Sequence, residues 1–116
     1  MNEKPIICID LDGVLNMYDG FRGGDYFHPP RPGAREFLEH LRNLGYEVVI
    51  LTVRWGPYVE SWLARHGLAR FVSRVTDRKP AAHVYIDDRA ICFNGDFDSA
   101  LRQILEFKAH WERECA

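Results

Sequence analysis

The fold of this chain is decided by IICIDLDGVLNM, residues 6–17, an apolar run that ends in two closely spaced acids. Residues 5–10, PIICID, are apolar and largely β-branched up to the final aspartate, which is typical of a strand buried in a parallel sheet. Asp10 and Asp12 stand at the end of that strand. Two carboxylates there repel each other and are costly to desolvate, so a cation is expected between them.

Outward from this strand, apolar residues recur with helical and with strand spacing in turn. Helices are expected from about Pro32 to Gly45, through Val59, Trp62 and Leu63 up to Gly67, and from near Asp98 through Leu101, Ile104, Leu105 and Trp111. Further strands are expected at residues 46–52, 71–75, 83–87 and 91–93. This alternation predicts one α/β domain with a mainly parallel sheet that is covered on both faces.

A loop or small flap is expected at about residues 14–30, because residues 16–30 carry three glycines and two prolines. Four aromatic side chains lie in it: Tyr18, Phe21, Tyr26 and Phe27. Two roles are open for them. They stack on a base or sugar of a substrate, or they pack together under the flap, and packing is the favoured role.

The composition argues against several classes of protein. With 116 residues, 47% hydrophobic and 28% charged, the chain fits one globular domain, and its formal net charge of -2 does not suggest a general nucleic-acid binder. No apolar run approaches the roughly 20 residues that span a bilayer, and the N-terminal MNEKP does not read as a signal peptide. Three scattered cysteines, Cys8, Cys92 and Cys115, favour a reducing compartment. We therefore expect a cytoplasmic protein with no membrane partner.

Polar residues separated by long stretches of sequence are predicted to meet at one edge of the sheet, because ligands of parallel sheets bind at the carboxyl ends of the strands. The residues at or next to those ends are Asp10, Asp12, Thr52, Lys79, Asp87 and Asp88. The four carboxylates and the lysine carry a formal charge of about -3. Carboxylate oxygens select a hard ion, and Mg²⁺ typically binds through one or two of them together with waters and a substrate phosphate.

This set of residues is suited to phosphoryl transfer. An aspartate can attack phosphorus, and a second carboxyl two residues on can protonate the leaving oxygen and then activate water. Thr52 would donate a hydrogen bond to a phosphoryl oxygen, and Lys79 would offset negative charge. Arg54 has two open roles, which are to hold a substrate group or to form a surface salt bridge.

The sequence resembles the haloacid dehalogenase (HAD) superfamily of phosphohydrolases. DLDGVL is similar to the first motif of that family, Thr52 at the end of VVILT to the second, Lys79 in RKP to the third, and YIDD with Asp87 and Asp88 to the fourth. The resemblance covers nearly the whole chain. It implies a Rossmann-like three-layer sandwich and a Mg²⁺-dependent phosphatase that hydrolyses a phosphomonoester through a phosphoaspartyl intermediate.

The resemblance also implies a role for each motif residue. Asp10 would be the nucleophile and a metal ligand, and Asp12 would be the acid/base and also a metal ligand through its backbone carbonyl. Asp87 would be a metal ligand, with Asp88 bound to the metal directly or through water. Family members that cleave carbon–halogen bonds lack the second aspartate, so Asp12 favours phosphate chemistry.

The chain has no room for the cap domain that many relatives carry, because the flap is short and residues 53–78 hold only a helix and a short strand. A capless member is expected to have an open site. Such a site suits a large or protruding phosphorylated substrate, or is closed by a neighbouring subunit, which leaves a homo-oligomer open.

Three other functions are consistent with parts of this pattern. A phosphotransferase or mutase of the same superfamily usually needs a cap to exclude water, and no cap is expected in this chain. A receiver domain also joins acids, a Thr or Ser and a Lys around Mg²⁺, but its adjacent acids come first, whereas here Asp10 and Asp12 come first and the adjacent pair comes last. A binding module that kept only the fold would not need acids at every motif position.

Overall fold

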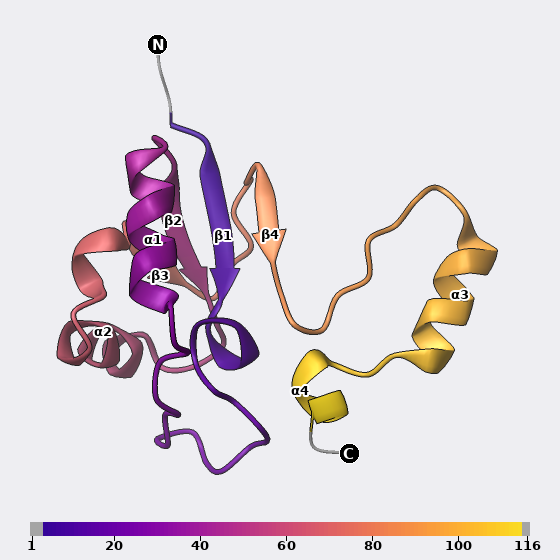
Figure 1. Ribbon diagram of the computed structural model, residues 1–116, viewed down its shortest axis with the longest axis horizontal. Helices are drawn as coiled ribbons and strands as arrows, with labels where there is room; N and C mark the ends of the chain where they lie inside the picture. The colour runs from indigo at the N-terminus through magenta and orange to yellow at the C-terminus, as the bar shows by residue number, and fades with distance from the viewer. Residues whose placement is uncertain (1–3, 115–116) are drawn as a thin grey trace.

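Four parallel strands form the centre of the molecule in the computed structural model, which describes residues 4–114 (Figure 1). The predictions made for residues 1–3 and for Cys115 concern positions outside this range. The strands are β1 (Ile6–Asp10), β2 (Glu47–Leu51), β3 (Arg74–Thr76) and β4 (Val84–Ile86). They lie in the order β3-β2-β1-β4, and every neighbouring pair is parallel. All four carboxyl ends therefore meet at one edge, as the sequence predicts.

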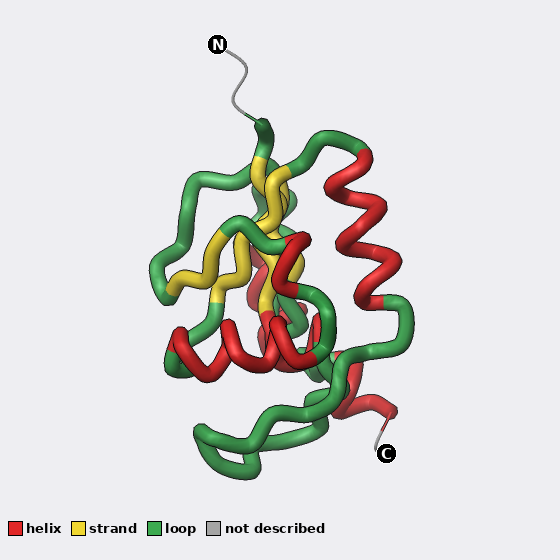
Figure 2. The backbone as a smooth tube through the Cα atoms, turned by 90° about the vertical axis from the view of Figure 1, so that its left-hand side faces the viewer, coloured by secondary structure: helices red, strands yellow, loops and turns green. Residues whose placement is uncertain are grey.

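Two helices supply the core on one side of the sheet, and Figure 2 shows helices packed beside the strands. They are α1 (Ala34–Asn43) and α2 (Gly56–Arg65), and a short 3-10 helix, η2 (Ala69–Phe71), follows α2. The core joins alternate residues of β1 and β2 to the apolar faces of these helices, and its members include Ile7, Ile9, Val48, Ile50, Leu38, Leu41, Val59, Trp62 and Leu63. Every second residue of each central strand faces this core, and a shift by one residue would turn those side chains to the other face. The burial of these residues therefore fixes the register of the central strands.

The opposite side of the sheet is covered by the connection between β3 and β4. Tyr85 is in register with Cys8, so its side chain lies on the face away from the core residue Ile7. The Lys79 ammonium lies 4.4 Å from the centre of the Tyr85 ring, and the Tyr85 hydroxyl donates to the Pro80 carbonyl. An all-parallel sheet with helices on one face, the β3–β4 connection on the other and no added cap is consistent with the Rossmann-like three-layer sandwich that the sequence predicts.

The flap forms directly after β1. A tight turn, η1 (Leu11–Leu15), is closed by the Asn16 N–H, which donates to the Leu11 carbonyl at 3.2 Å. Residues 17–29 then make an irregular excursion, and its two ends are joined by an antiparallel bridge between Asn16 and Pro30. The predicted loop at residues 16–30 is therefore confirmed.

The C-terminal part differs from the prediction. No strand forms at residues 91–93, and the last helix is divided into α3 (Phe97–Glu106) and α4 (His110–Glu114). The Asp96 carboxylate caps α3 by accepting from the Asp98 N–H at 3.0 Å. The prediction of one continuous helix was wrong. Helix α3 ends at Glu106, Ala109 is buried and its N–H donates to the Glu112 side chain, and a new helix begins at His110.

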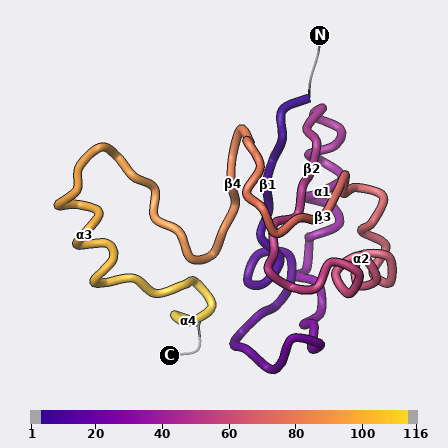
Figure 3. Tube along the Cα trace, turned by 180° about the vertical axis from the view of Figure 1, so that it is seen from behind, coloured from indigo at the N-terminus to yellow at the C-terminus, as the bar shows by residue number. Residues whose placement is uncertain are grey.

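Helix α3 stands away from the sheet beyond β4, as the front and back views agree (Figures 1 and 3). None of its residues is buried, and Phe97, Leu101, Ile104 and Leu105 are all exposed. Among residues 4–114, no helix is both long enough and apolar enough to cross a membrane.

Candidate active site

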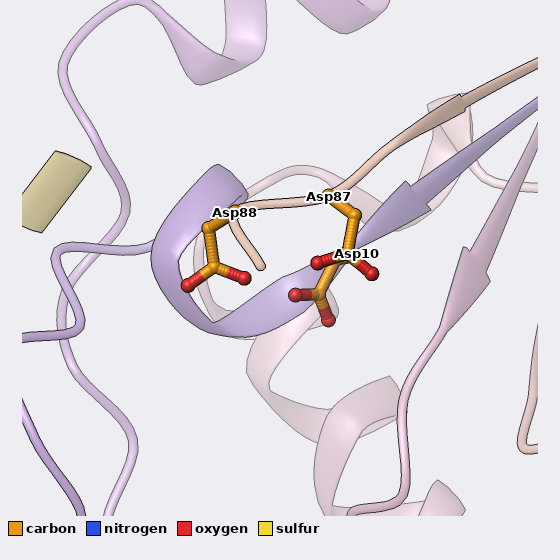
Figure 4. A group of neighbouring side chains, drawn as sticks. All are labelled: Asp10, Asp87 and Asp88. Carbon is orange, nitrogen blue, oxygen red and sulfur yellow. The ribbon is translucent and has the colours of Figure 1, made fainter. Parts of the chain in front are cut away.

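Three carboxylates gather where β1 and β4 end. Asp10 closes β1, and Asp87 and Asp88 follow β4 directly, so the parallel pairing of these two strands brings the acids together. One oxygen from each side chain lies within 4.8 Å of the others, and Figure 4 shows the three side chains next to one another. Three of the four predicted metal ligands therefore form one cluster.

Asp10 has the most perturbed environment of the cluster. Its carboxylate accepts a hydrogen bond from the Leu11 N–H at 2.9 Å, which favours the charged form. Burial opposes this, together with a hydrogen bond to Asp88 and repulsion from Asp87 and Asp88, and the pKa of Asp10 rises to about 8. Without a cation, the cluster therefore retains a proton near neutral pH.

The Asp12 carboxylate has different partners from the other three acids. Arg54 Nε donates to its Oδ2 at 2.6 Å, and Asn16 Nδ2 donates to its Oδ1 at 3.0 Å. Asn16 is fully buried, and its own side-chain oxygen accepts from the backbone N–H groups of Gly13 and Tyr18. Asp12 is thus held by a network next to the cluster, and its side chain is not part of the three-acid group.

Arg54 connects this network to the flap. Its guanidinium also donates to the carbonyls of Gly24 at 3.1 Å and Tyr26 at 2.8 Å, and it lies 4.5 Å from the centre of the Phe27 ring. The Arg54 side chain is only 7% exposed, so its pair with Asp12 is largely buried. Arg54 therefore forms a largely buried salt bridge with Asp12, in place of the surface salt bridge that the sequence left open.

Gly13 allows the second acid of YIDD to approach the turn. Its φ is +86°, and a Cβ added there would lie 2.1 Å from Asp88 Oδ2. Asp88 also accepts from Trp111 Nε1 at 2.6 Å, and His110 Nε2 lies 2.6 Å from the Gly13 carbonyl oxygen. Helix α4 thus packs on the site, whereas Trp111 was expected to belong to a helix that covers the sheet.

Thr52 follows β2 at the same edge, whereas Lys79 lies on the face of the sheet opposite the core, and among residues 4–114 neither side chain is hydrogen-bonded to the acids. Thr52 is buried, and its hydroxyl accepts from the Arg54 backbone N–H at 3.2 Å. The backbone N–H of Thr52 donates to the Thr76 carbonyl. Thr52 lines a separate cavity of about 410 Å³. Lys79 is exposed over the Tyr85 ring, and within residues 4–114 it forms no ion pair with the cluster.

A cavity of about 540 Å³ opens beside the acids, in the size range of small-molecule sites. Its lining includes Asp10, Asp12, Asp88, Arg89, Tyr18, Phe21, Trp55 and Tyr58. Of the flap aromatics, Tyr18 and Tyr26 pack edge-on against His28, and Phe27 contacts Trp62. Phe21 is 74% exposed on the cavity. Packing is thus the observed role of three of the four.

The sequence reasoning missed two groups that build the site. Asn16 directly follows the first motif, three residues after Gly13, so an Asn-turn could have been suspected there. His110 and Trp111 offered no comparable signal, because the residues they contact are 97 and 23 positions away in the sequence.

Comparisons with known proteins support the fold. No protein-family model matches the chain, and none of the curated proteins searched matches it. Among solved structures, a conserved protein from Bacteroides thetaiotaomicron is similar over 96% of this chain and 98% of its own, with 20% identity and a TM-score of 0.58. An uncharacterized protein from Listeria monocytogenes serotype 4b is 19% identical over 87% of this chain and 61% of its own, with a TM-score of 0.48. The Bacteroides likeness shows that another chain has this fold over nearly its full length.

Because the pKa of Asp10 is raised, we expect the free energy of unfolding of the protein to depend on pH when a chelator keeps divalent cations away. The folded protein holds a proton up to about pH 8, which the unfolded chain releases near pH 3.8. The folded state therefore binds more protons, and the free energy of unfolding should fall by about 2 kcal/mol between these pH values, after allowance for solvent screening. Urea denaturation in EDTA measures this slope. Asp10→Asn should flatten it, and an unchanged slope in that variant would contradict the assignment.

Proposed function

We propose that this chain is a Mg²⁺-dependent phosphatase that hydrolyses a phosphomonoester through a phosphoaspartyl intermediate. The observation that carries the proposal is the meeting of Asp10, Asp87 and Asp88 within 4.8 Å at the carboxyl ends of two parallel strands. Asp10 and Asp88 also line the adjacent cavity, together with Asp12. A nucleophile, an acid/base and a group of oxygen ligands are therefore available to one bound substrate.

The three-acid cluster fits a hard divalent cation. It offers only carboxylate oxygens, its ionised form would carry three negative charges, and burial, together with the neighbouring Asp88 and Asp87, raises the pKa of Asp10. Asp10, Asp87 and Asp88 would hold Mg²⁺, with Asp87 oriented by the Arg89 N–H that donates to it at 2.8 Å. The ion would supply positive charge that offsets the repulsion between the carboxylates and a phosphate dianion.

The protein's own residues account for both chemical steps. In the first, a carboxylate oxygen of Asp10 forms a bond to phosphorus, the ester P–O bond breaks, and the leaving oxygen takes a proton from Asp12. In the second, the Asp12 carboxylate removes a proton from water, the resulting hydroxide attacks phosphorus, and the bond to Asp10 breaks. Arg54 and Asn16 act as positioning residues that aim the Asp12 carboxylate.

The two remaining motif residues would need to approach the substrate. Thr52 would donate its hydroxyl to a phosphoryl oxygen, and Lys79 would offset charge on the transferred group. Thr52 directly follows β2, whereas Lys79 lies over the Tyr85 ring on the face of the sheet opposite the core, and its exposed side chain would have to reorient to reach a substrate. Because the cavity is open, water can reach the phosphoaspartyl group, which favours hydrolysis over transfer to a second substrate.

The test is a screen for phosphate release over nucleotides, sugar phosphates, aryl phosphates, oligonucleotide ends and phosphopeptides, each with Mg²⁺ and with EDTA. We expect release from at least one class in Mg²⁺ and none in EDTA. Asp98→Asn on α3, which removes an exposed acid far from the cluster, is the matched control and should release phosphate normally. Absence of release from every class in Mg²⁺, or equal release in EDTA, would contradict the proposal.

A further inference from the structure

The cavity beside the acids has an unusual wall for a site that handles phosphate. Three aromatic side chains line it from two segments: Phe21 from the flap, and Trp55 and Tyr58 from the start of α2. They are 74%, 64% and 51% exposed, whereas Trp62 of the same helix is buried. Exposed aromatic groups that converge on a cavity indicate a surface for a flat apolar group.

The two arginines of the same wall already have partners within the protein. Arg54 donates to Asp12 and to two flap carbonyls, so its guanidinium has little left for a ligand. Arg89 pairs with Glu112 at 3.2 Å and lies over the rings of Phe107 and Trp111. A sugar ring placed against the three aromatic side chains, where a flat ring could stack, would lose hydrogen bonds to water and gain none from the rings, which costs binding free energy.

We propose that this cavity binds the leaving group of the substrate as a flat aromatic ring stacked on Trp55 and Tyr58, so that aryl or nucleoside phosphomonoesters are the preferred substrates. The inference rests on the proposed function, which places the phosphate at the acid cluster. A ring in the cavity and a phosphate at Asp10 are compatible, because Asp10 and Trp55 line the same space. Stacking of a base on an aromatic side chain contributes about 1–3 kcal/mol, which corresponds to roughly 5-fold to 160-fold in affinity.

The kinetic test compares phenyl phosphate, a nucleoside monophosphate and a hexose 6-phosphate in Mg²⁺. We expect kcat/KM to be at least about tenfold higher for the ring-bearing substrates. Trp55→Leu keeps an apolar side chain but removes the ring, so it should raise KM for these substrates about tenfold and narrow the gap to the hexose phosphate. Trp55→Phe should restore most of the difference. Phe93→Leu, which alters an exposed aromatic residue outside the cavity, is the matched control.

A second measurement separates this inference from the proposed function. Adenosine and phenol carry no phosphate, so their binding reports on the ring surface alone. We expect adenosine or phenol, but not ribose, to quench the fluorescence of exposed Trp55, and Trp55→Phe to remove the change. Quenching without any phosphate release would uphold the ring surface and contradict the phosphatase. Phosphate release that is equally efficient from hexose and ring substrates, with no quenching, would overturn the ring surface and leave the phosphatase standing. The better of the two ring substrates identifies whether the ring is an aryl ester or a base.

Discussion

Asparagine at position 10 is expected to lower kcat for phosphate release by at least about 10³-fold. The carboxylate of Asp10 is the proposed attacking group, and an amide oxygen is a much weaker nucleophile. The substitution keeps the shape of the side chain and leaves an oxygen to accept from the Leu11 N–H. It also removes one negative charge from a crowded cluster, so the variant should fold at least as well as the parent in EDTA.

The measurement is phosphate release at saturating Mg²⁺, with the melting temperature recorded in parallel to show that the variant is folded. Rapid acid quenching should detect a covalently bound phosphoryl group in the parent protein and none in Asp10→Asn. Asp98→Asn serves again as the matched substitution, since it makes the same chemical change on a helix outside the site. Unchanged turnover in Asp10→Asn would remove this residue as the nucleophile.

Asp12→Asn is expected to slow turnover by about 10²–10⁴-fold while leaving Mg²⁺ affinity close to that of the parent. Asparagine cannot give a proton to the leaving oxygen or take one from water. Its side-chain oxygen can still accept from Arg54 Nε, so the link to the flap is retained. Mg²⁺ affinity should change little because the Asp12 carboxylate is directed at Arg54 and Asn16 and lies outside the three-acid cluster.

The nature of the leaving group makes this second prediction specific. An ester with p-nitrophenolate as its leaving group needs no proton in the first step, so in Asp12→Asn the phosphoaspartyl form should accumulate and only its hydrolysis should be slow. An alkyl ester should be slow in both steps. Stopped-flow kinetics and calorimetric titration with Mg²⁺ distinguish these effects. Loss of Mg²⁺ affinity larger than the loss of rate would assign Asp12 to metal binding instead.

The elements around the acid cluster were predictable because their signals are local. The apolar runs before Asp10 and within residues 46–52 are typical of buried parallel strands, and parallel strands bring their carboxyl ends to one edge whatever the length of the connections. The meeting of Asp10 with Asp87 and Asp88 follows from this rule, although 77 positions separate Asp10 from Asp87.

The C-terminal part of the site was not predictable for the opposite reason. The segment between α3 and α4 contains no proline or glycine to mark a break. The break is explained by contacts within the fold: Ala109 is buried, and its N–H donates to the Glu112 carboxylate at 2.9 Å. The position of Trp111 against Asp88 depends on this break, so it could not be inferred from helical spacing.

The two C-terminal helices differ in how they are held: α3 has no buried residue, whereas α4 contacts the site. A helix of ten residues is only marginally stable on its own in water, and α3 buries no side chain against the sheet. Helix α4 is fastened independently, through His110 to Gly13 and through Trp111 to Asp88. If α3 unfolded, the ten residues of this helix could change the length of the connection between β4 and α4. The distances between the three acids would stay the same, because α4 keeps its own contacts with Gly13 and Asp88.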